Sequence, residues 1–211
     1  MAEAPLARAP RETLEALVRE AARAPSVHNV QPARWRFEPG GDVVLFRALD
    51  RTLPVADPSG HDVQASLGAA FEGMAIALSR FDLRLGAPVP ERVAQAEGCE
   101  PVVRARISTR GALDPLAEFV EQRRSYRGKF SRRGARELNA ARSLAAADVH
   151  VIDDALDIRL SSKSHDAATW RFESRPEYHA ELWSWLRLSH RDPNWRRDGL
   201  NADCLALSAA E

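Results

Sequence analysis

Apolar positions near the start of the chain change from helical to strand spacing. After Pro10, leucine, valine and alanine recur three or four residues apart, which predicts a helix that Pro25 ends. The stretches "RWRFE" and "VVLFR" are then rich in aromatic and β-branched residues, as strands are. Because Pro39, Gly40 and Gly41 separate the two stretches, we expect a hairpin here.

Helical spacing returns after the loop "TLPVADPSGHD", from about residue 63 to about residue 81. Alanine and glycine are frequent in this stretch, so we expect a narrow helix that packs closely in the core. The later stretch "PVVRARIST" places Val103, Ala105 and Ile107 at every second position, between charged or polar residues. This alternation predicts a strand with one buried face.

After residue 110 the pattern is less regular and mostly helical. We expect helices at about 114–124, 131–147, 155–172 and 176–188, and a short strand in "DVHVID". The mixed order of elements predicts an α+β fold in which helices cover an antiparallel or mixed sheet. The elements before Gly111 form a fuller set than those after it. We therefore expect one domain, 1–211, built from two unequal halves at 1–110 and 111–211.

Composition excludes several classes of protein. The chain has 211 residues and is 45% hydrophobic, which is typical of a folded domain. Its 30 basic residues balance 30 acidic ones, so a general nucleic-acid binder is not expected, although a local basic patch is compatible with this balance. Two cysteines are too few for a disulfide framework and favour a reducing cytoplasm. We see no apolar signal region and no apolar run of about 18 residues, so we expect no contact with a membrane.

The stretch "RRSYRGKF" is a candidate anion site. Arg123, Ser125 and Arg127 recur at every second residue, and in an extended segment alternate side chains share one side. Two planar guanidinium groups and a hydroxyl on one side suit a phosphate. The alternative is an ordinary solvated basic run at a helix end, and this stretch alone does not decide between the two.

The stretch "APSVHNVQP" is a candidate site for a planar heterocycle. Ser26, Asn29 and Gln31 supply short hydrogen-bond donors and acceptors without adding charge. The alternative is a proline-bounded connector whose polar side chains cap the backbone. His28 could serve as a proton donor there or be an ordinary loop histidine. The six histidines of the chain are scattered without metal-ligand spacing, so we expect no metal site.

Together the two stretches resemble the FMN-dependent nitroreductase family, in which a "PSxxNxQPW" segment contacts the flavin and an "RxSxR" segment holds its phosphate. The order of a helix, the "APSxxNxQPxxF" segment, a strand and a Gly/Ala-rich helix also resembles that family. The resemblance covers nearly the whole chain and is strongest at 23–80. It implies a nitroreductase-like fold with FMN as the cofactor. The residues implied to contact the flavin ring or its ribityl chain are Ser26, Asn29 and Gln31, and those implied to hold the phosphate are Arg123, Ser125 and Arg127.

The fuller pattern "RAPSVHNVQPARWRF…DPSGHD…LGAAFEGMAIAL" resembles most closely the internally duplicated, Acg-like branch found in actinobacteria and other bacteria. That branch explains why the phosphate motif follows the "PS" segment here, whereas it precedes that segment in ordinary nitroreductases. Ala33 stands where an aromatic residue is expected, and Trp35 lies two positions on. Members of the branch run on for roughly another half-domain beyond the equivalent of Glu211. We therefore expect an incomplete second half and a flavin pocket that lacks a wall.

The resemblance implies an oxidoreductase that passes electrons from NAD(P)H through FMN to a nitro or quinone-like acceptor. No side chain is assigned as its acid or base. One alternative is an Acg-like protein that binds and sequesters flavin without turnover, and another is a fold that has lost its ligand. The partners expected are a nicotinamide cofactor and a small-molecule acceptor. We also expect the chain either to form a homo-oligomer or to be only marginally stable alone, because apolar side chains such as Leu182, Trp183 and Leu186 would otherwise lack a cover.

Overall fold

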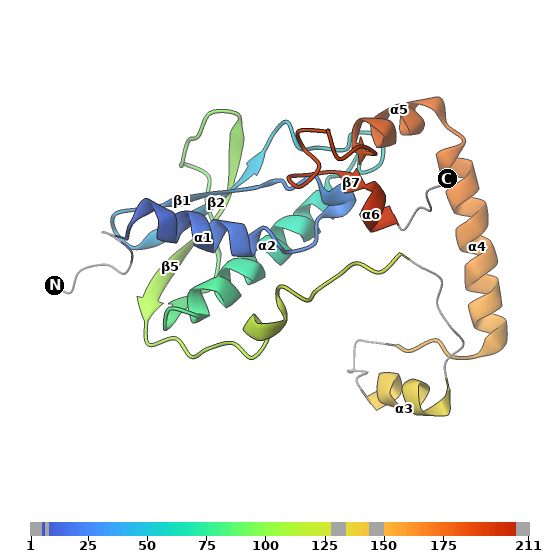
Figure 1. Ribbon diagram of the computed structural model, residues 1–211, viewed down its shortest axis with the longest axis horizontal. Helices are drawn as coiled ribbons and strands as arrows, with labels where there is room; N and C mark the ends of the chain where they lie inside the picture. The colour runs from blue at the N-terminus through green and yellow to red at the C-terminus, as the bar shows by residue number, and fades with distance from the viewer. Residues whose placement is uncertain (1–5, 7–8, 128–133, 144–149, 206–211) are drawn as a thin grey trace.

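An antiparallel sheet forms one side of the first half of the molecule (Figure 1). The computed structural model describes residues 6, 9–127, 134–143 and 150–205. The strand order is β1-β2-β5-β3, and β4 also pairs with β5. The strands are β1 (Ala33–Phe37), β2 (Asp42–Ala48), β3 (Leu83–Leu85), β4 (Val89–Pro90) and β5 (Cys99–Thr109). Every pairing in this sheet is antiparallel, as the hairpin pattern of the sequence predicts.

The predicted hairpin is present and leads into the centre of the sheet. Ala33 pairs with Arg47 and Phe37 pairs with Val43, and the turn between them uses Gly41 with a φ of 89°, a conformation that glycine adopts without strain. The four residues 43–46 are all buried. Consecutive burial means that both faces of β2 are covered, so this strand belongs to the core.

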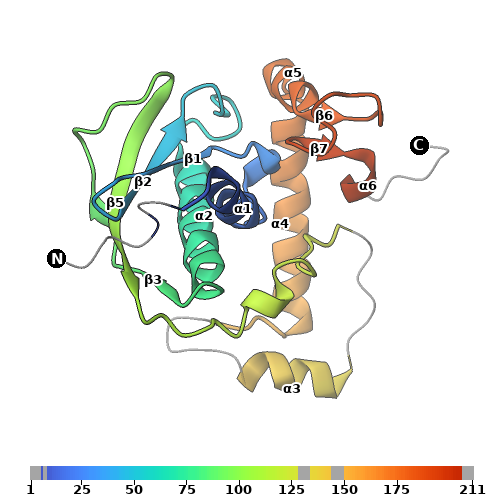
Figure 2. The same cartoon turned by 60° about the vertical axis from the view of Figure 1, so that its left-hand side comes forward.

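Two helices pack against each other beside the sheet (Figure 2). Helix α1 (Arg11–Ala21) contributes Leu17 and Ala21 to the core, and α2 (His61–Ser79) contributes Met74, Ala77 and Leu78. The helices approach closely at one position, because a Cβ added to Gly73 would lie 2.9 Å from the carbonyl oxygen of Ala21. This confirms the prediction of a narrow helix in close contact with its neighbours.

The rest of the chain is mainly helical and reaches around the first half. Figure 1 shows α4 standing apart from the sheet, and no residue of α4 is buried. Helix α5 returns the chain to the body, where both Glu181 carboxylate oxygens accept backbone N–H groups, from Val55 at 2.9 Å and from Ala56 at 2.7 Å. The elements are η2 (Ala117–Phe119), α3 (Ala135–Ser143), α4 (Ala155–Glu173), α5 (Pro176–Ser184), β6 (Leu186–Arg187), β7 (Leu200–Asn201) and α6 (Ala202–Leu205).

The α+β class, the first helix, the hairpin, the second helix and the long strand are confirmed. The expected helix at 114–124 is wrong, because the chain forms only the short 3-10 turn η2 there. Its apolar side chains Leu116 and Phe119 remain at least half exposed. Most helical stability in proteins comes from burying an apolar face, and this segment buries only Ala117.

The strand expected in "DVHVID" is also wrong at 150–153, where no strand forms; residues 148 and 149 lie outside the described part. The helix expected at 176–188 ends at Ser184, since β6 begins at Leu186 and pairs in parallel with β7. Of the helix expected at 131–147, α3 is described and the ends are not. The boundary between two halves near residue 110 and the homo-oligomer stay predictions, the latter in keeping with the exposed Trp170 and Trp183.

Candidate functional site

The segment after α1 has an unusual backbone. His28, Asn29 and Gln31 have φ values of 43°, 54° and 52°, all in the left-handed region. Asparagine tolerates this region, but for other residues with a side chain it costs on the order of 1–2 kcal/mol. Strain of this kind persists only where the surroundings impose it, and it is concentrated at ligand sites in many proteins. Three such residues within four positions therefore make this segment a candidate ligand site.

Short polar side chains impose this conformation. The hydroxyl of Ser66 on α2 accepts the backbone N–H of Val27 at 3.0 Å. The hydroxyl of Ser26 accepts the backbone N–H of Gln31 at 3.2 Å, and the Gln31 amide donates to Asn29 Oδ1 at 2.7 Å. Polar side chains that bond to nearby backbone in this way stabilise turns rather than helices. The sequence stretch therefore does turn a corner, and it also holds its side chains in fixed positions.

A segment 170 residues further along the chain fastens the same corner. Asn29 Nδ2 donates to the carbonyl oxygen of Gly199 at 2.9 Å, and the Gly199 N–H donates to the Asn29 carbonyl at 3.0 Å. Gly199 has a φ of 75°, and a Cβ there would overlap the carbonyl oxygen of Trp185. Only glycine fits both the conformation and the space.

A buried ion-pair network holds the residue beside Gly199. The carboxylate of Asp198 is 4% exposed and accepts hydrogen bonds from Arg187 at 2.7 and 3.1 Å and from Arg51. Burial alone raises the pKa of Asp198, but hydrogen bonds from the two guanidinium groups outweigh it, so the net shift of its pKa is downward. Arg51 follows β2 and Arg187 ends β6, so Asp198 ties the C-terminal segment to the first half.

The arginine-rich segment 123–127 lies on the opposite side of the corner and is not helical. Arg123 Nε donates to the carbonyl oxygen of Arg23 at 3.1 Å, and its Nη1 lies 3.4 Å from Ser125 Oγ. Arg124 donates to two carbonyl oxygens of its own segment, those of Glu121 and Arg123. Within the described part of the chain, the side chain of Arg127 forms no hydrogen bond or ion pair.

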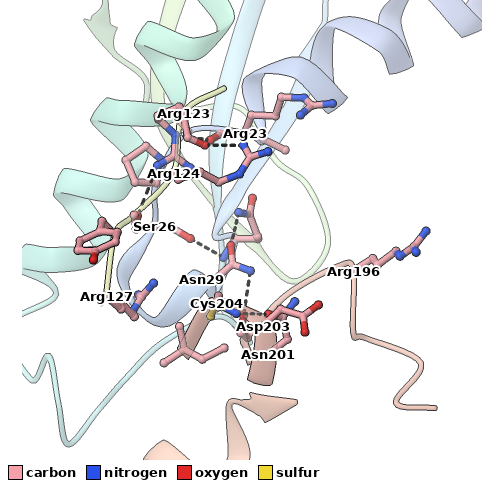
Figure 3. Close-up of a pocket in the computed structure, with 18 of the residues that line it drawn as sticks. Arg23, Ser26, Asn29, Arg123, Arg124, Arg127, Arg196, Asn201, Asp203 and Cys204 are labelled. Carbon is pink, nitrogen blue, oxygen red and sulfur yellow. Dashed lines mark hydrogen bonds between the residues drawn. The ribbon is translucent and has the colours of Figure 1, made fainter. Parts of the chain in front are cut away.

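These three segments enclose an open cavity of about 1260 Å³ (Figure 3). All six residues predicted to contact FMN line it: Ser26, Asn29, Gln31, Arg123, Ser125 and Arg127. Five arginines line the cavity, against the single carboxylate of Asp203. Such an excess of one charge in a concave site attracts anions. The residues brought together are nearly 100 positions apart in the sequence, and they form one polar, positively charged site.

His28 is not among the residues that line the cavity. Its Nδ1 is buried without a hydrogen-bond partner in the described structure. Burial lowers the pKa of His28 below its usual value; Glu181 and Asp62 oppose this shift and Arg127 adds to it. The structure thus favours a neutral imidazole beside the cavity, and it gives no support to His28 as a proton donor.

Several lining residues were not expected from the sequence: Arg23, Arg124, Arg196, Gly199, Asn201, Asp203 and Cys204. Arg23 and Arg124 stand next to the recognised motifs, so adjacency could have suggested them. The others come from the C-terminal segment, which carries no local motif and is held at the cavity by the contacts of Asn29 and Asp198. Trp35, considered as a substitute for the aromatic residue after "QP", packs against both core clusters instead.

The described residues include neither a metal-binding cluster nor a membrane-spanning helix. No group of three or more His, Cys, Asp or Glu side chains among the described residues is placed to hold a metal ion. None of the helices that the structure describes has the length and apolar character needed to cross a bilayer.

The chain is similar to mycobacterial proteins. It is 32% identical over 202 residues to the uncharacterized protein Rv3127 of Mycobacterium tuberculosis, covering 90% of this chain and 56% of that protein. It therefore spans about half the length of this relative. It is also 37% identical over 68 residues to the "Putative NAD(P)H nitroreductase acg" of the same organism, which covers 32% of this chain and 20% of that protein. No family model matches the chain. The partial matches support a relationship to nitroreductase-like proteins.

The chain also matches solved structures, at low sequence identity and low TM-score. A nitroreductase-like protein from Streptococcus mutans matches 56% of this chain and 89% of its own, with 15% identity and a TM-score of 0.39. "A putative nitroreductase in complex with FMN" from Desulfovibrio desulfuricans matches 65% of this chain and 86% of its own, with 15% identity and a TM-score of 0.38. The α+β class itself rests on the strands and helices described above.

Proposed function

We propose that this chain is part of an FMN-dependent oxidoreductase, which takes electrons from NAD(P)H and passes them to a nitro or quinone-like acceptor. The observation that carries the proposal is the convergence of two distant motifs on one cavity. Ser26, Asn29 and Gln31 reach it from the corner after α1, and Arg123, Ser125 and Arg127 reach it from the segment after η2. The partial likeness to proteins named as NAD(P)H nitroreductases supports the same reading.

The residues present fit the phosphate end of FMN. Arg127 has an unpaired guanidinium among the described residues, and Arg123 uses only part of its five N–H donors on Arg23 and Ser125. Planar guanidinium groups bind phosphate through paired, charge-assisted hydrogen bonds. The phosphate of FMN would therefore lie between Arg123 and Arg127, with the hydroxyl of Ser125 as a third donor.

The polar residues of the corner after α1 fit the uncharged part of FMN, its ring and ribityl chain. The Gln31 amide and the Asn29 amide each commit one N–H, to Asn29 Oδ1 and to the Gly199 carbonyl. Each amide has a second N–H left, and Gln31 keeps its own oxygen. The Ser26 hydroxyl accepts one backbone N–H and can still donate its proton. These free groups can meet the polar edge of a flavin ring or the hydroxyls of its ribityl chain without repelling either.

The protein's part in the reaction is binding, orientation and tuning. FMN, when bound, would supply the redox chemistry of hydride uptake from a pyridine nucleotide and two-electron transfer to the acceptor. The strained corner fixes the hydrogen-bonding groups in place before the cofactor arrives, so little reorganisation is needed on binding. The excess of arginine keeps the local potential positive, and a positive potential favours the reduced, more anionic form of a bound flavin.

The experiment is anaerobic addition of NADPH or NADH to the FMN-loaded protein. The proposal predicts loss of the flavin absorbance near 450 nm, followed by its recovery when a nitroaromatic compound or a quinone is added. An FMN-loaded protein that neither nucleotide reduces would contradict turnover and would leave the sequestering role as the alternative. The sequence does not distinguish NADH from NADPH, so both are tested.

A further inference from the structure

The cavity offers more room and more positive charge than the proposed FMN site uses. Ligand pockets typically measure about 300–1,000 Å³, and this one measures about 1260 Å³. Of its five arginines, Arg123 and Arg127 are assigned to the flavin phosphate. Arg23 is paired with Glu121 at 3.2 Å, and Arg124 is bonded to carbonyl oxygens of its own segment. Arg196 is left over.

Arg196 lines a different wall of the cavity from the proposed phosphate residues. Figure 3 shows Arg127 on one side and Arg196 on the other, with Asn29, Asn201 and Cys204 between them. The Arg196 side chain is exposed and, like that of Arg127, forms no hydrogen bond or ion pair within the described part of the chain. A phosphate held by Arg123 and Arg127 at one side leaves the opposite guanidinium without an anion.

The backbone around Arg196 is well fixed, although the side chain is exposed. Trp195 before it is 8% exposed, packs against the ring of His190 and accepts a hydrogen bond from Asn201 Nδ2 at 3.2 Å. Asp198, two positions after it, is held by the ion-pair network, and Gly199 is clamped to Asn29. The position of Arg196 on the cavity wall is therefore set by packing and not by the arginine itself.

We propose that Arg196 binds a phosphate group of the electron donor, a phosphorylated pyridine nucleotide, and so forms a second phosphate subsite in the cavity. This inference rests on the proposed function. The flavin phosphate already has its own proposed partners, and the donor is the other ligand of the proposed reaction that always carries phosphate. Asp203 lines the same cavity and is the one lining carboxylate, and its charge opposes an anion.

Two phosphates of the donor have the required chemistry: the pyrophosphate shared by NADH and NADPH, and the 2′-phosphate found only in NADPH. Both are oxygen-rich anions that a guanidinium recognises in the same way. The structure indicates where on the cavity wall a phosphate would bind. Comparing NADH with NADPH shows which of the two phosphates binds there.

The test compares Arg196→Ala with Arg197→Ala. The neighbouring Arg197 is also exposed but lines the adjacent groove beside α1 and not the cavity, so it is a matched control for charge and position in the sequence. The FMN-loaded proteins are mixed anaerobically with NADPH or NADH, and the donor Kd and the limiting rate of flavin reduction are measured. We expect Arg196→Ala to raise the donor Kd about 10–100-fold, the usual effect of losing a charge-assisted hydrogen bond, with the limiting rate and the FMN Kd unchanged. Arg197→Ala should leave all three unchanged.

A rise for NADPH alone assigns the 2′-phosphate, and an equal rise for both donors assigns the pyrophosphate. Either result supports the second subsite. Equal donor affinities in the parent and in Arg196→Ala, or a matching loss of FMN affinity, would overturn it.

Titration with adenosine 2′,5′-bisphosphate and ADP, with FMN present, gives a readout without turnover. If FMN does not bind, the proposed function fails, yet a weaker response of Arg196→Ala than of Arg197→Ala to these probes would still show the subsite.

Discussion

At the residue scale, the account depends on single side chains that face the cavity, and Arg127 gives the cleanest test. Its guanidinium has no protein partner in the described structure, so its removal disturbs little else. Arg127→Ala should weaken FMN binding about 10–100-fold, because a charge-assisted hydrogen bond is lost. Riboflavin lacks the phosphate and should lose much less affinity. Fluorescence titration with both flavins measures this.

The control for that substitution is Arg84→Ala. Arg84 is an exposed arginine on β3 that does not line the cavity, and its loss removes the same charge. Equal effects of the two substitutions on FMN affinity would mean that net charge alone matters and that Arg127 has no direct contact.

His28 leads to a prediction about pH. Burial lowers its pKa in the folded protein below the usual value of about 6.5, so the unfolded chain binds a proton more readily. Stability should therefore be highest above pH 6.5 and should fall as the pH drops from about 7 towards the lowered pKa. The charged groups that influence the ring are Glu181, Arg127 and Asp62. Denaturant unfolding across this range should show the decline, and His28→Gln should reduce it. An unchanged pH profile in the variant would place the titration elsewhere.

At the element scale, alanine substitutions at two glycines of α2 distinguish the effect of close helix packing on stability from the effect of helix propensity. A Cβ at Gly73 would lie 2.9 Å from the Ala21 carbonyl oxygen, whereas nothing lies within 4 Å at Gly68. Gly73→Ala should destabilise the fold by about 1–3 kcal/mol through overpacking. Gly68→Ala should stabilise it by about 0.5–1 kcal/mol, because alanine favours the helix. Opposite signs in the free energy of unfolding are the expected result, and a gain for both would show that α1 does not approach α2 so closely.

The elements that the sequence predicted well share one property: their pattern coincides with burial. Residues 43–46 and Leu17, Met74 and Leu78 are buried where the spacing places them. The helix expected at 114–124 failed because its apolar residues face solvent, and propensity alone does not sustain a short helix. Strands β6 and β7 have two residues each and form by pairing with each other across more than ten residues of chain. No local sequence pattern could therefore predict them.

At the scale of the whole molecule, the candidate site forms where three segments that are distant in the sequence meet: residues 22–31, 123–127 and 196–204. The six candidate residues were found from two local motifs, but Arg196, Asn201 and Asp203 were not, because they are placed by tertiary contacts of Asn29 and Asp198. The division into two halves and the flavin pocket that lacks a wall both stay predictions.

Gly199→Ala tests this long-range docking. The new Cβ would overlap the Trp185 carbonyl and lie 3.0 Å from Arg187 Cγ, at a φ of 75° that alanine disfavours. The strain of the backbone alone costs on the order of 1–2 kcal/mol. The C-terminal wall should then detach from Asn29, so FMN affinity and thermal stability should fall together. Gly40→Ala, where nothing lies within 4 Å, is the control and should change neither. Parent-like FMN binding in Gly199→Ala would show that this wall is dispensable.

The central claim is that the cavity lined by Ser26, Asn29, Gln31, Arg123, Ser125 and Arg127 binds FMN through its phosphate. The most direct measurement is parallel titration of the unaltered protein with FMN and with riboflavin. The account predicts saturable binding of one FMN per chain, and about 10–100-fold weaker binding of riboflavin, which lacks the phosphate. Equal affinity for the two flavins, or no saturable binding of either, would contradict it.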